Sequence, residues 1–155
     1  MICAIVREMA TSIEILMVED DAGDIAYTRD MFAEHRLGNR MTVLSDGLQA
    51  ITYLRRQPPY ADVSRPDLIL LDLNLPVVDG RTVLEFIRNE PTLREIVVVV
   101  LTTSDVEEQV LRGFGVPADR YVRKPVDFER LVDVVRSVQD FYVEVKRTVD
   151  NIPLK

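Results

Sequence analysis

Long hydrophobic runs and cysteines are both scarce in this chain of 155 residues. The longest apolar runs, such as Ile96–Leu101, are far shorter than the ~20 residues that a helix needs to cross a bilayer. Cys3 is the single cysteine, so no intramolecular disulfide can form, and a lone thiol fits a reducing compartment. We therefore expect a cytoplasmic protein without a membrane segment.

Basic residues are also in the minority. The chain has 19 Lys and Arg residues against 26 Asp and Glu residues, which gives a formal net charge of −7. Proteins bind a nucleic-acid backbone through clustered Lys and Arg, and this sequence contains no such stripe. Direct binding of nucleic acid is therefore not expected. The one histidine, His35, falls at the end of a predicted helix and is interpreted as a surface residue.

The remaining composition is that of a folded domain. Hydrophobic residues make up 47% of the chain and charged residues 29%, and a chain of this length can bury a core without disulfides or metal. Residues 1–12 lack the basic start and the long apolar stretch of a secretion signal. We expect an N-terminal extension at 1–12, one domain at 13–138 and a C-terminal extension at 139–155.

Short apolar runs alternate with amphipathic stretches throughout this domain. The runs at 67–72 and 96–101 show no polar alternation, which is typical of strands covered on both faces. Strands that alternate with helices through short connections predict a parallel sheet. The fold class is thus α/β, with a five-stranded, doubly wound parallel sheet. The expected strands are 13–18, 41–44, 67–72, 96–101 and 120–123, and the expected helices are 22–35, 48–54, 80–89, 106–112 and a long helix from 127.

Four of the expected strands end in polar side chains, and the carboxyl ends of parallel strands meet at one edge of the sheet. Carboxylates crowded there repel one another unless a cation neutralises them, and oxygen ligands suit a hard divalent ion such as Mg²⁺. An Asp carboxylate can become an aspartyl phosphate, while an ammonium and a hydroxyl can bind phosphoryl oxygens. The pattern predicts a site that handles phosphoryl groups. Its residues are Glu19, Asp20, Asp21, Asp72, Thr102 and Lys124.

Each of these residues has a plainer interpretation when it is taken singly. Asp20, Asp21 or Asp24 could cap the first helix. Lys124 could be a surface lysine, and the Thr102 hydroxyl could bond to backbone at the end of its strand. The convergence of several such residues at one edge of the sheet favours the site over these alternatives.

The joint pattern resembles the receiver domain of two-component response regulators over about Ile13–Val138. Thr102 lies 30 residues after Asp72, and Lys124 lies 22 residues after Thr102, spacings similar to those of compact receivers. The resemblance implies the flavodoxin-like strand order 2-1-3-4-5. It rests on Glu19-Asp20, Asp72, Asn74, Pro76, Gly80, Thr102, Tyr121 and Lys124-Pro125.

The resemblance also implies a set of Mg²⁺ ligands. Glu19, Asp20 and Asp72 would supply carboxylates, and Asn74 would supply its backbone carbonyl. Most receivers have Asp where this chain has Glu19. The longer side chain leaves open whether Glu19 contacts the ion directly or through a water molecule.

By the same resemblance, other residues would act on the phosphoryl group. Asp72 would be the phosphoacceptor, Thr102 would bind a phosphoryl oxygen and Lys124 would pair with the transferred group. Thr102 and Tyr121 would form the conformational switch. A cis peptide would join Lys124 to Pro125.

The implied function is that of a single-domain response regulator without an output domain. It would accept a phosphoryl group on Asp72 from a histidine kinase and then switch its partner-binding surface. Its own phosphorylation and dephosphorylation would be its only chemistry, so a turnover enzyme is not expected. One alternative is a phosphatase or phosphotransferase with an aspartyl nucleophile, although Asn74 stands where such enzymes usually place an acidic Asp. Another is an interaction module that works without phosphorylation.

Two further features narrow the resemblance and suggest partners. Prolines within 57–66 lengthen the connection before the third strand, and together with Asp72–Pro76 and the long tail they resemble stand-alone receivers paired with bacterial phytochromes. Apolar residues in the tail recur at alternating steps of 3 and 4, as in a helical seam that pairs two chains. A homodimer is therefore expected through Tyr142, Val145 and Val149, with the tail as either helix or extended arm.

Overall fold

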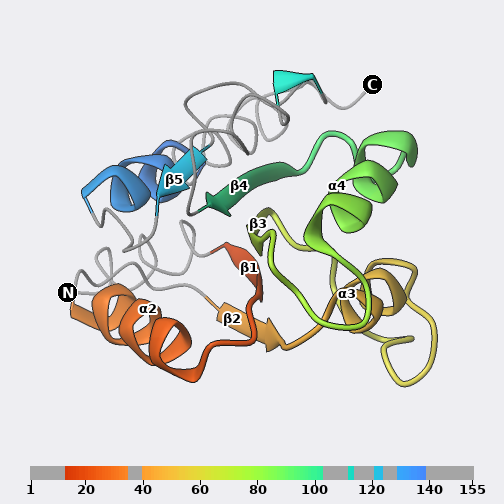
Figure 1. Ribbon diagram of the computed structural model, residues 1–155, viewed down its shortest axis with the longest axis horizontal. Helices are drawn as coiled ribbons and strands as arrows, with labels where there is room; N and C mark the ends of the chain where they lie inside the picture. The colour runs from red at the N-terminus through yellow and green to blue at the C-terminus, as the bar shows by residue number, and fades with distance from the viewer. Residues whose placement is uncertain (1–12, 35–39, 103–111, 114–120, 124–128, 139–155) are drawn as a thin grey trace, which may run out of the picture.

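The computed structural model describes residues 13–34, 40–102, 112–113, 121–123 and 129–138. Five parallel strands form one sheet in the order β2-β1-β3-β4-β5 (Figure 1). Residues 129–138 are helical, and three helices have defined ends. None of the helices in these ranges is both long and apolar enough to span a membrane. The elements are β1 (Glu14–Val18), α2 (Ala22–Glu34), β2 (Arg40–Leu44), α3 (Gly47–Leu54), β3 (Leu68–Asp72), α4 (Gly80–Asn89), β4 (Val97–Thr102) and β5 (Tyr121–Arg123).

The ends of these elements agree with the sequence-based expectations to within one residue. The strongest agreement is for the two unbroken apolar runs, which form the neighbouring strands β3 and β4 and pair Leu70 with Val99. The expected helix at 106–112, except its last residue, lies outside the described residues, as does the extension at 139–155.

Side chains of the central strands alternate between the two faces of the sheet, and helices cover both faces. Leu16 and Val18 of β1 pack with α3 and α4, whereas Ile15 and Met17 pack with α2 and with residues 129–138. Figure 1 shows α2 and the blue helix on one side of the sheet and α3 and α4 on the other. The sheet is therefore doubly wound.

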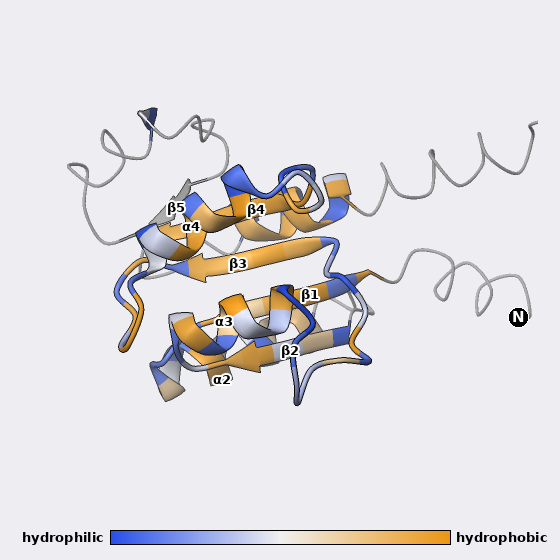
Figure 2. Ribbon diagram, turned by 90° about the vertical axis from the view of Figure 1, so that its right-hand side faces the viewer, coloured by the Kyte–Doolittle hydropathy of each residue, from blue (hydrophilic) through white to orange (hydrophobic). Residues whose placement is uncertain are grey.

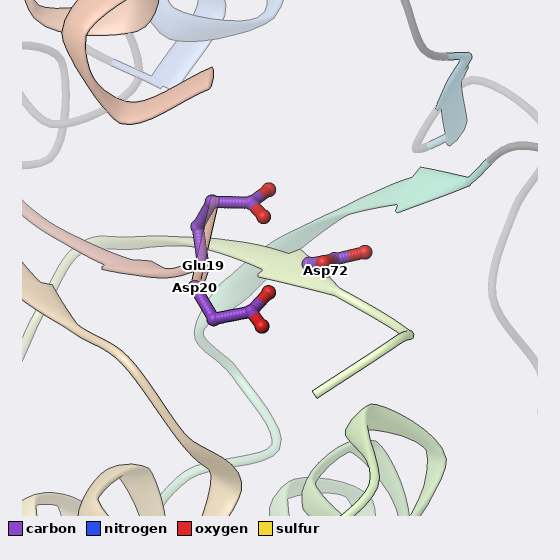
Figure 3. A group of neighbouring side chains, drawn as sticks. All are labelled: Glu19, Asp20 and Asp72. Atoms are coloured by element: carbon purple, nitrogen blue, oxygen red, sulfur yellow. The ribbon is translucent and has the colours of Figure 1, made fainter. Parts of the chain in front are cut away.

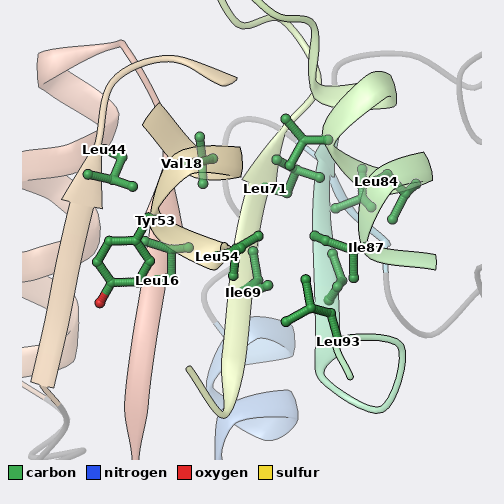
Figure 4. Close-up of a cluster of buried hydrophobic side chains, with 14 of the residues drawn as sticks. Leu16, Val18, Leu44, Tyr53, Leu54, Ile69, Leu71, Leu84, Ile87 and Leu93 are labelled. Carbon is green, nitrogen blue, oxygen red and sulfur yellow. The ribbon is translucent and has the colours of Figure 1, made fainter. Parts of the chain in front are cut away.

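Strand β3 lies at the centre of this arrangement. All five of its residues are buried, and its ribbon is coloured hydrophobic along most of its length in Figure 2. Figure 4 shows Leu71 of β3 near Leu84 and Ile87 of α4 in the core on one face of the sheet. Burying a side chain of this size contributes about 1.5–3 kcal/mol. This packing fixes the position of Asp72 at the end of the strand.

Two Asp-Gly pairs begin the helices on the α3 and α4 face. Asp46 accepts a hydrogen bond from the Gln49 amide at 2.7 Å, and Asp79 accepts one from the Arg81 amide at 2.8 Å. Such caps satisfy amides that lack a partner within the helix. The glycine after each Asp allows a close backbone approach: a Cβ on Gly47 would lie against the Val78 carbonyl, and one on Gly80 against the Asp72 carbonyl. Both helices thus start in direct contact with the connection that follows β3.

Candidate functional site

Three carboxylates gather at the carboxyl edge of the sheet. Glu19 and Asp20 follow β1 directly, and Asp72 is the last residue of β3. β1 and β3 are paired in parallel, with Val18 opposite Leu71, so both strands end at the same level. One oxygen from each of the three carboxylates lies within 4.8 Å of the others. Figure 3 shows Glu19 and Asp20 extending from the end of β1 toward the side on which Asp72 lies.

The cluster combines buried and exposed acids. Glu19 is 0% exposed and Asp72 is 3% exposed, whereas Asp20 is exposed. Removing carboxylates from water is costly unless hydrogen bonds or a cation compensate. Backbone amides supply part of this compensation, because Glu19 Oε1 accepts from the Asp21 amide and Asp72 Oδ1 accepts from the Asn74 amide, both at 3.2 Å. The three carboxylates still repel one another at this separation, so the donor set fits a hard divalent cation.

Asp20 and Asp21 are neighbours in the sequence but serve different purposes. The Asp21 carboxylate accepts a hydrogen bond from the Asp24 amide at 2.8 Å and so caps α2. Of the three capping candidates in the sequence, Asp21 is therefore the residue that caps this helix. Asp20 belongs instead to the carboxylate cluster.

The connection between β3 and α4 is held by backbone hydrogen bonds that span very few residues. The Leu75 amide donates to the Leu73 carbonyl at 3.2 Å, and the Val78 amide donates to the Pro76 carbonyl at 2.8 Å. The Pro76 carbonyl also accepts from the Gly47 amide of α3 at 3.5 Å. This connection is therefore tied both to the end of β3 and to the start of α3.

Val77 has an unusual backbone conformation within this connection. Its φ is 68°, and the hydrogen bond that spans it makes the rare γ-turn with positive φ. A β-branched residue in this region is strained, at a cost on the order of 1–3 kcal/mol. The side chain is 76% exposed, so little packing within the chain offsets this cost.

The sequence interpretation missed Val77 and the close packing of the Asp-Gly pairs. The two Asp-Gly pairs, Asp46-Gly47 and Asp79-Gly80, were a usable signal, since Asp is a good N-cap and a following Gly permits close approach. No comparable signal exists for Val77, because a Val-Val dipeptide argues against a turn with positive φ.

The remaining predicted site residues are only partly covered by the described residues. Thr102 ends β4 one position beyond Leu101, which pairs with Asp72, so its backbone reaches the same edge of the sheet. Tyr121 begins β5 and pairs with Val100. Lys124 and Pro125, with the cis peptide expected between them, and the dimer residues Tyr142, Val145 and Val149 lie outside the described residues.

Family comparison agrees with this fold and this cluster. Residues 15–136 match the family model described as the response regulator receiver domain. The chain therefore belongs to the response regulator receiver family.

One similar protein is the response regulator Rcp1. The chain is 38% identical over 130 residues to "Response regulator Rcp1" of Synechocystis sp., which covers 84% of this chain and 88% of Rcp1. The Mn²⁺-bound form of Rcp1 superimposes with a TM-score of 0.69 at 35% identity, covering 92% of this chain and 99% of that chain.

Two further solved structures extend this comparison. The bacteriophytochrome response regulator RtBRR has a TM-score of 0.73 and 38% identity, covering 81% of this chain and 77% of that chain. The phosphorylated cyanobacterial phytochrome response regulator RcpA has a TM-score of 0.70 and 37% identity, covering 86% and 96%. Like Rcp1 and RcpA, this chain is a response regulator of phosphorylation-dependent two-component signalling.

Proposed function

We propose that the chain accepts a phosphoryl group on Asp72 from a histidine kinase and changes its partner-binding surface in response. The observation that carries this proposal is the cluster of Glu19, Asp20 and Asp72, whose oxygens from two strand ends lie within 4.8 Å of one another. Asp72 ends a strand that is buried along its whole length, so its carboxylate is held in a fixed position.

The transfer is a displacement at phosphorus. One Asp72 oxygen forms a bond to the phosphorus atom while the phosphorus–nitrogen bond of a phosphohistidine breaks, and the imidazole leaves with the electron pair of that bond. The Asn74 amide donates to Asp72 Oδ1 and helps to orient the carboxylate for attack. Asp72 is 3% exposed, so most of its surface is shielded from water and from donors in solution.

Mg²⁺ is the proposed ion, and its ligands would be the carboxylates of Glu19, Asp20 and Asp72 with the Asn74 carbonyl. When bound, it would neutralise the charge of the carboxylates and of the phosphoryl oxygens. The Mn²⁺-bound form of Rcp1, and the receiver domain of PA1611 with Mg²⁺ in its active-site cleft, support a divalent ion as the bound group. Glu19 is fully buried, and its Oε1 accepts a hydrogen bond from the Asp21 backbone amide.

Three other residues are assigned by their positions in the receiver motif. Thr102 binds a phosphoryl oxygen, Lys124 pairs with the transferred group through its ammonium, and Tyr121 responds as the aromatic part of the switch. The pairing of Leu101 with Asp72 supports this role for Thr102, because the ends of β3 and β4 then lie side by side. The cis peptide between Lys124 and Pro125 belongs to the same proposal.

Turnover of other substrates is not proposed. Receiver-domain regulators are not enzymes in the usual sense, and the proposed chemistry is the self-catalysed phosphorylation and dephosphorylation of Asp72. An aspartyl-nucleophile phosphatase is not favoured, since Asn74 occupies the position of the second acid in such enzymes and an amide cannot donate a proton there. A module independent of phosphorylation is disfavoured by the assembled carboxylate cluster.

The phosphoacceptor is tested with acetyl phosphate, a small donor that needs no partner protein. Incubation with Mg²⁺ is expected to add one phosphoryl group, seen by intact-protein mass spectrometry, in the natural chain and in Asp21→Asn. No hydroxylamine-sensitive adduct is expected in Asp72→Asn. An equal adduct in Asp72→Asn, with a native circular dichroism spectrum, would show that another residue is the acceptor.

The domain plan, location and partners are proposed on related grounds. One receiver domain at 13–138 lies between extensions at 1–12 and 139–155, acts in the cytoplasm, spans no membrane, and binds no nucleic acid directly. Its kinase is a bacterial phytochrome, in keeping with the names of RtBRR and RcpA.

Homodimerisation through the 139–155 extension is part of the same plan, supported by the apolar steps of 3 and 4 that contain Tyr142, Val145 and Val149. Sedimentation of the full chain is expected to give a dimer. The double variant Val145→Asp with Val149→Asp is expected to sediment as a monomer, because two buried, unpaired carboxylates per subunit oppose the interface. A variant that stays as dimeric as the natural chain would exclude the extension from the interface.

A further inference from the structure

The structure assigns a second role to the connection after β3: we propose that Val77, assisted by Leu48, is a recognition surface for the protein that donates the phosphoryl group. This inference rests on the proposed function of Asp72. Val77 would determine which phosphodonor protein transfers efficiently, without taking part in the transfer.

The first argument is that nothing described within the chain explains a valine at this position. Its backbone has a φ of 68°, which a β-branched residue adopts at a cost. Asn or Gly adopts this conformation more easily. The hydrogen bond of the turn runs from the Val78 amide to the Pro76 carbonyl and does not involve the side chain.

The second argument is exposure. The Val77 side chain is 76% exposed, so its apolar surface faces water and is not part of the core. A strained residue whose side chain packs against little of its own chain is best explained by a contact outside the chain. The strained side chain is apolar, so the external contact that offsets the strain is expected to be apolar as well.

The third argument is position. The connection that carries Val77 starts directly after Asp72, and its Pro76 carbonyl accepts from the amide of Gly47. The residue after Gly47 is Leu48, another exposed apolar side chain, at 52% exposure. The exposed apolar residues Val77 and Leu48 therefore belong to two segments that are bonded to each other at the edge of the candidate site.

The fourth argument identifies the occupant. Asp72 is only 3% exposed, so a phosphohistidine must be brought down onto the rim of the site to reach it. Asp20 and Asp21, in the connection that follows β1, and Asp79, in the connection that follows β3, are exposed, and their carboxylates offer an apolar partner no favourable contact. In the described residues the large apolar side chains that are exposed are Tyr27, Leu48 and Val77. Of these, Leu48 and Val77 lie on the two segments that the Gly47–Pro76 hydrogen bond joins next to Asp72, and there a protein gains free energy by burying apolar surface. The occupant is thus a phosphodonor protein with an apolar side chain beside its phosphohistidine.

The test compares a protein donor with a small donor on the same variants of the full chain. The histidine kinases of the source organism are autophosphorylated with labelled ATP and screened in short incubations with the natural chain. The fastest of them is the protein donor, and acetyl phosphate is the small donor. Three variants change Val77. Val77→Thr keeps the branched shape and the strain but adds a hydroxyl, Val77→Asn relieves the strain, and Val77→Ile keeps both the strain and the apolar surface. The fourth variant, Leu48→Gln, makes the second exposed side chain polar.

With the protein donor, Val77→Thr and Val77→Asn are expected to lower kcat/KM about tenfold, the effect of losing ~1.4 kcal/mol of apolar contact. Leu48→Gln should lower kcat/KM about threefold, since roughly half of that side chain is already buried in the free protein. Val77→Ile should keep the natural rate. With acetyl phosphate, all four variants should react within about twofold of the natural chain, because a small donor covers no rim surface.

Three results would overturn the inference. Natural rates from the protein donor in Val77→Thr and Val77→Asn would remove the recognition role. Equal losses with both donors would mean that Val77 positions the site and does not recognise a partner. Acetyl phosphate labelling of Asp72 without transfer from any kinase would reject a protein-recognition surface while leaving Asp72 as the acceptor. Failure of Asp72 labelling with either donor would instead reject the proposed function itself.

Discussion

Two connections bring carboxylates to the same cluster, and they are built in different ways. Between β1 and α2, Asp21 caps the helix through a 2.8 Å hydrogen bond, and no non-glycine residue there has a positive φ. Between β3 and α4, the chain turns at Val77 with a φ of 68° and then passes close to its own backbone at Gly80. The first connection can be explained by local side-chain chemistry. The second depends on close packing and retains a residue that its conformation disfavours.

The two connections differ in whether their unusual residues can be explained by the stability of the fold. Asp21 and Gly80 each have a physical reason within the chain: Asp21 caps α2, and Gly80 permits the close approach of α4 to the backbone after β3. The Val77 side chain has no such reason, because it is exposed and strained. When a residue has an unfavourable backbone conformation and no contact within its own chain offsets the cost, a contact with a partner protein is the best explanation for keeping it.

The largest expected effect comes from breaking the close packing of the second connection. Gly80→Ala is expected to destabilise the fold by ~3 kcal/mol, because its Cβ would lie against the Asp72 carbonyl and 2.6 Å from the Leu73 Cα, neither of which can move freely. Urea denaturation monitored by circular dichroism measures the change in the free energy of unfolding.

Gly23→Ala, in the first turn of α2 just after the first connection, is the matched control. An added Cβ there meets only the Asp21 side-chain oxygen, at 3.1 Å, and an alanine in the helix contributes up to ~1 kcal/mol relative to glycine. We expect a change in unfolding free energy of no more than about 1 kcal/mol in either direction. Similar losses of unfolding free energy in Gly23→Ala and Gly80→Ala would show that both sites tolerate an added Cβ equally, and that the second connection does not depend more on close packing than the first.

The next prediction concerns the different roles of the neighbouring acids Asp20 and Asp21 in metal binding and helix capping. Asp20→Asn is expected to weaken Mg²⁺ binding about tenfold, because it removes one of the three clustered charges. Asp21→Asn removes a charge of the same sign one residue away but keeps a side chain that can cap α2, so its affinity should stay within about twofold. Isothermal titration calorimetry with MgCl₂ measures both. Equal losses would place Asp21 in the metal site.

Much of the fold could be predicted because its signals are local and strong. The unbroken apolar stretch Leu68–Leu71 is followed by an acid, and this combination correctly predicted a buried strand with a polar end. The amphipathic pattern that begins at 127 predicted a helix, and residues 129–138 are helical. These predictions succeeded because hydrophobic period and burial are directly coupled.

The site could be predicted only in outline. Glu19, Asp20 and Asp72 were expected together, and their oxygens do lie within 4.8 Å. The sequence alone could not tell which of Asp20, Asp21 and Asp24 caps α2, because each carboxylate can accept from a backbone amide two or three residues later. The structure identifies Asp21 by its hydrogen bond from the Asp24 amide. The conformation of Val77 could not be predicted, since intrinsic preference for that residue indicates the opposite.

The smallest expected effect concerns the strain in the second connection. Val77→Asn is expected to increase the free energy of unfolding by about 1 kcal/mol, because Asn tolerates a positive φ and the exposed valine contributes little packing. For a chain of this size, thermal denaturation should show an increase in Tm of a few degrees. Val77→Thr keeps the β-branch and should leave Tm unchanged.

Arg56 gives a second reference for this strain, because its φ is 54° and it follows the end of α3. Arg is not β-branched, so Arg56→Asn should stabilise the chain by less than Val77→Asn does. A loss of stability in Val77→Asn would mean that the valine side chain stabilises the turn after all, and the comparison between the two connections would then be one of packing alone. If Val77→Asn instead gains stability and also receives the phosphoryl group more slowly from the protein donor, stability and recognition are separate properties of this position. Val77 would then be kept for recognition at the expense of stability, as its exposure and φ imply.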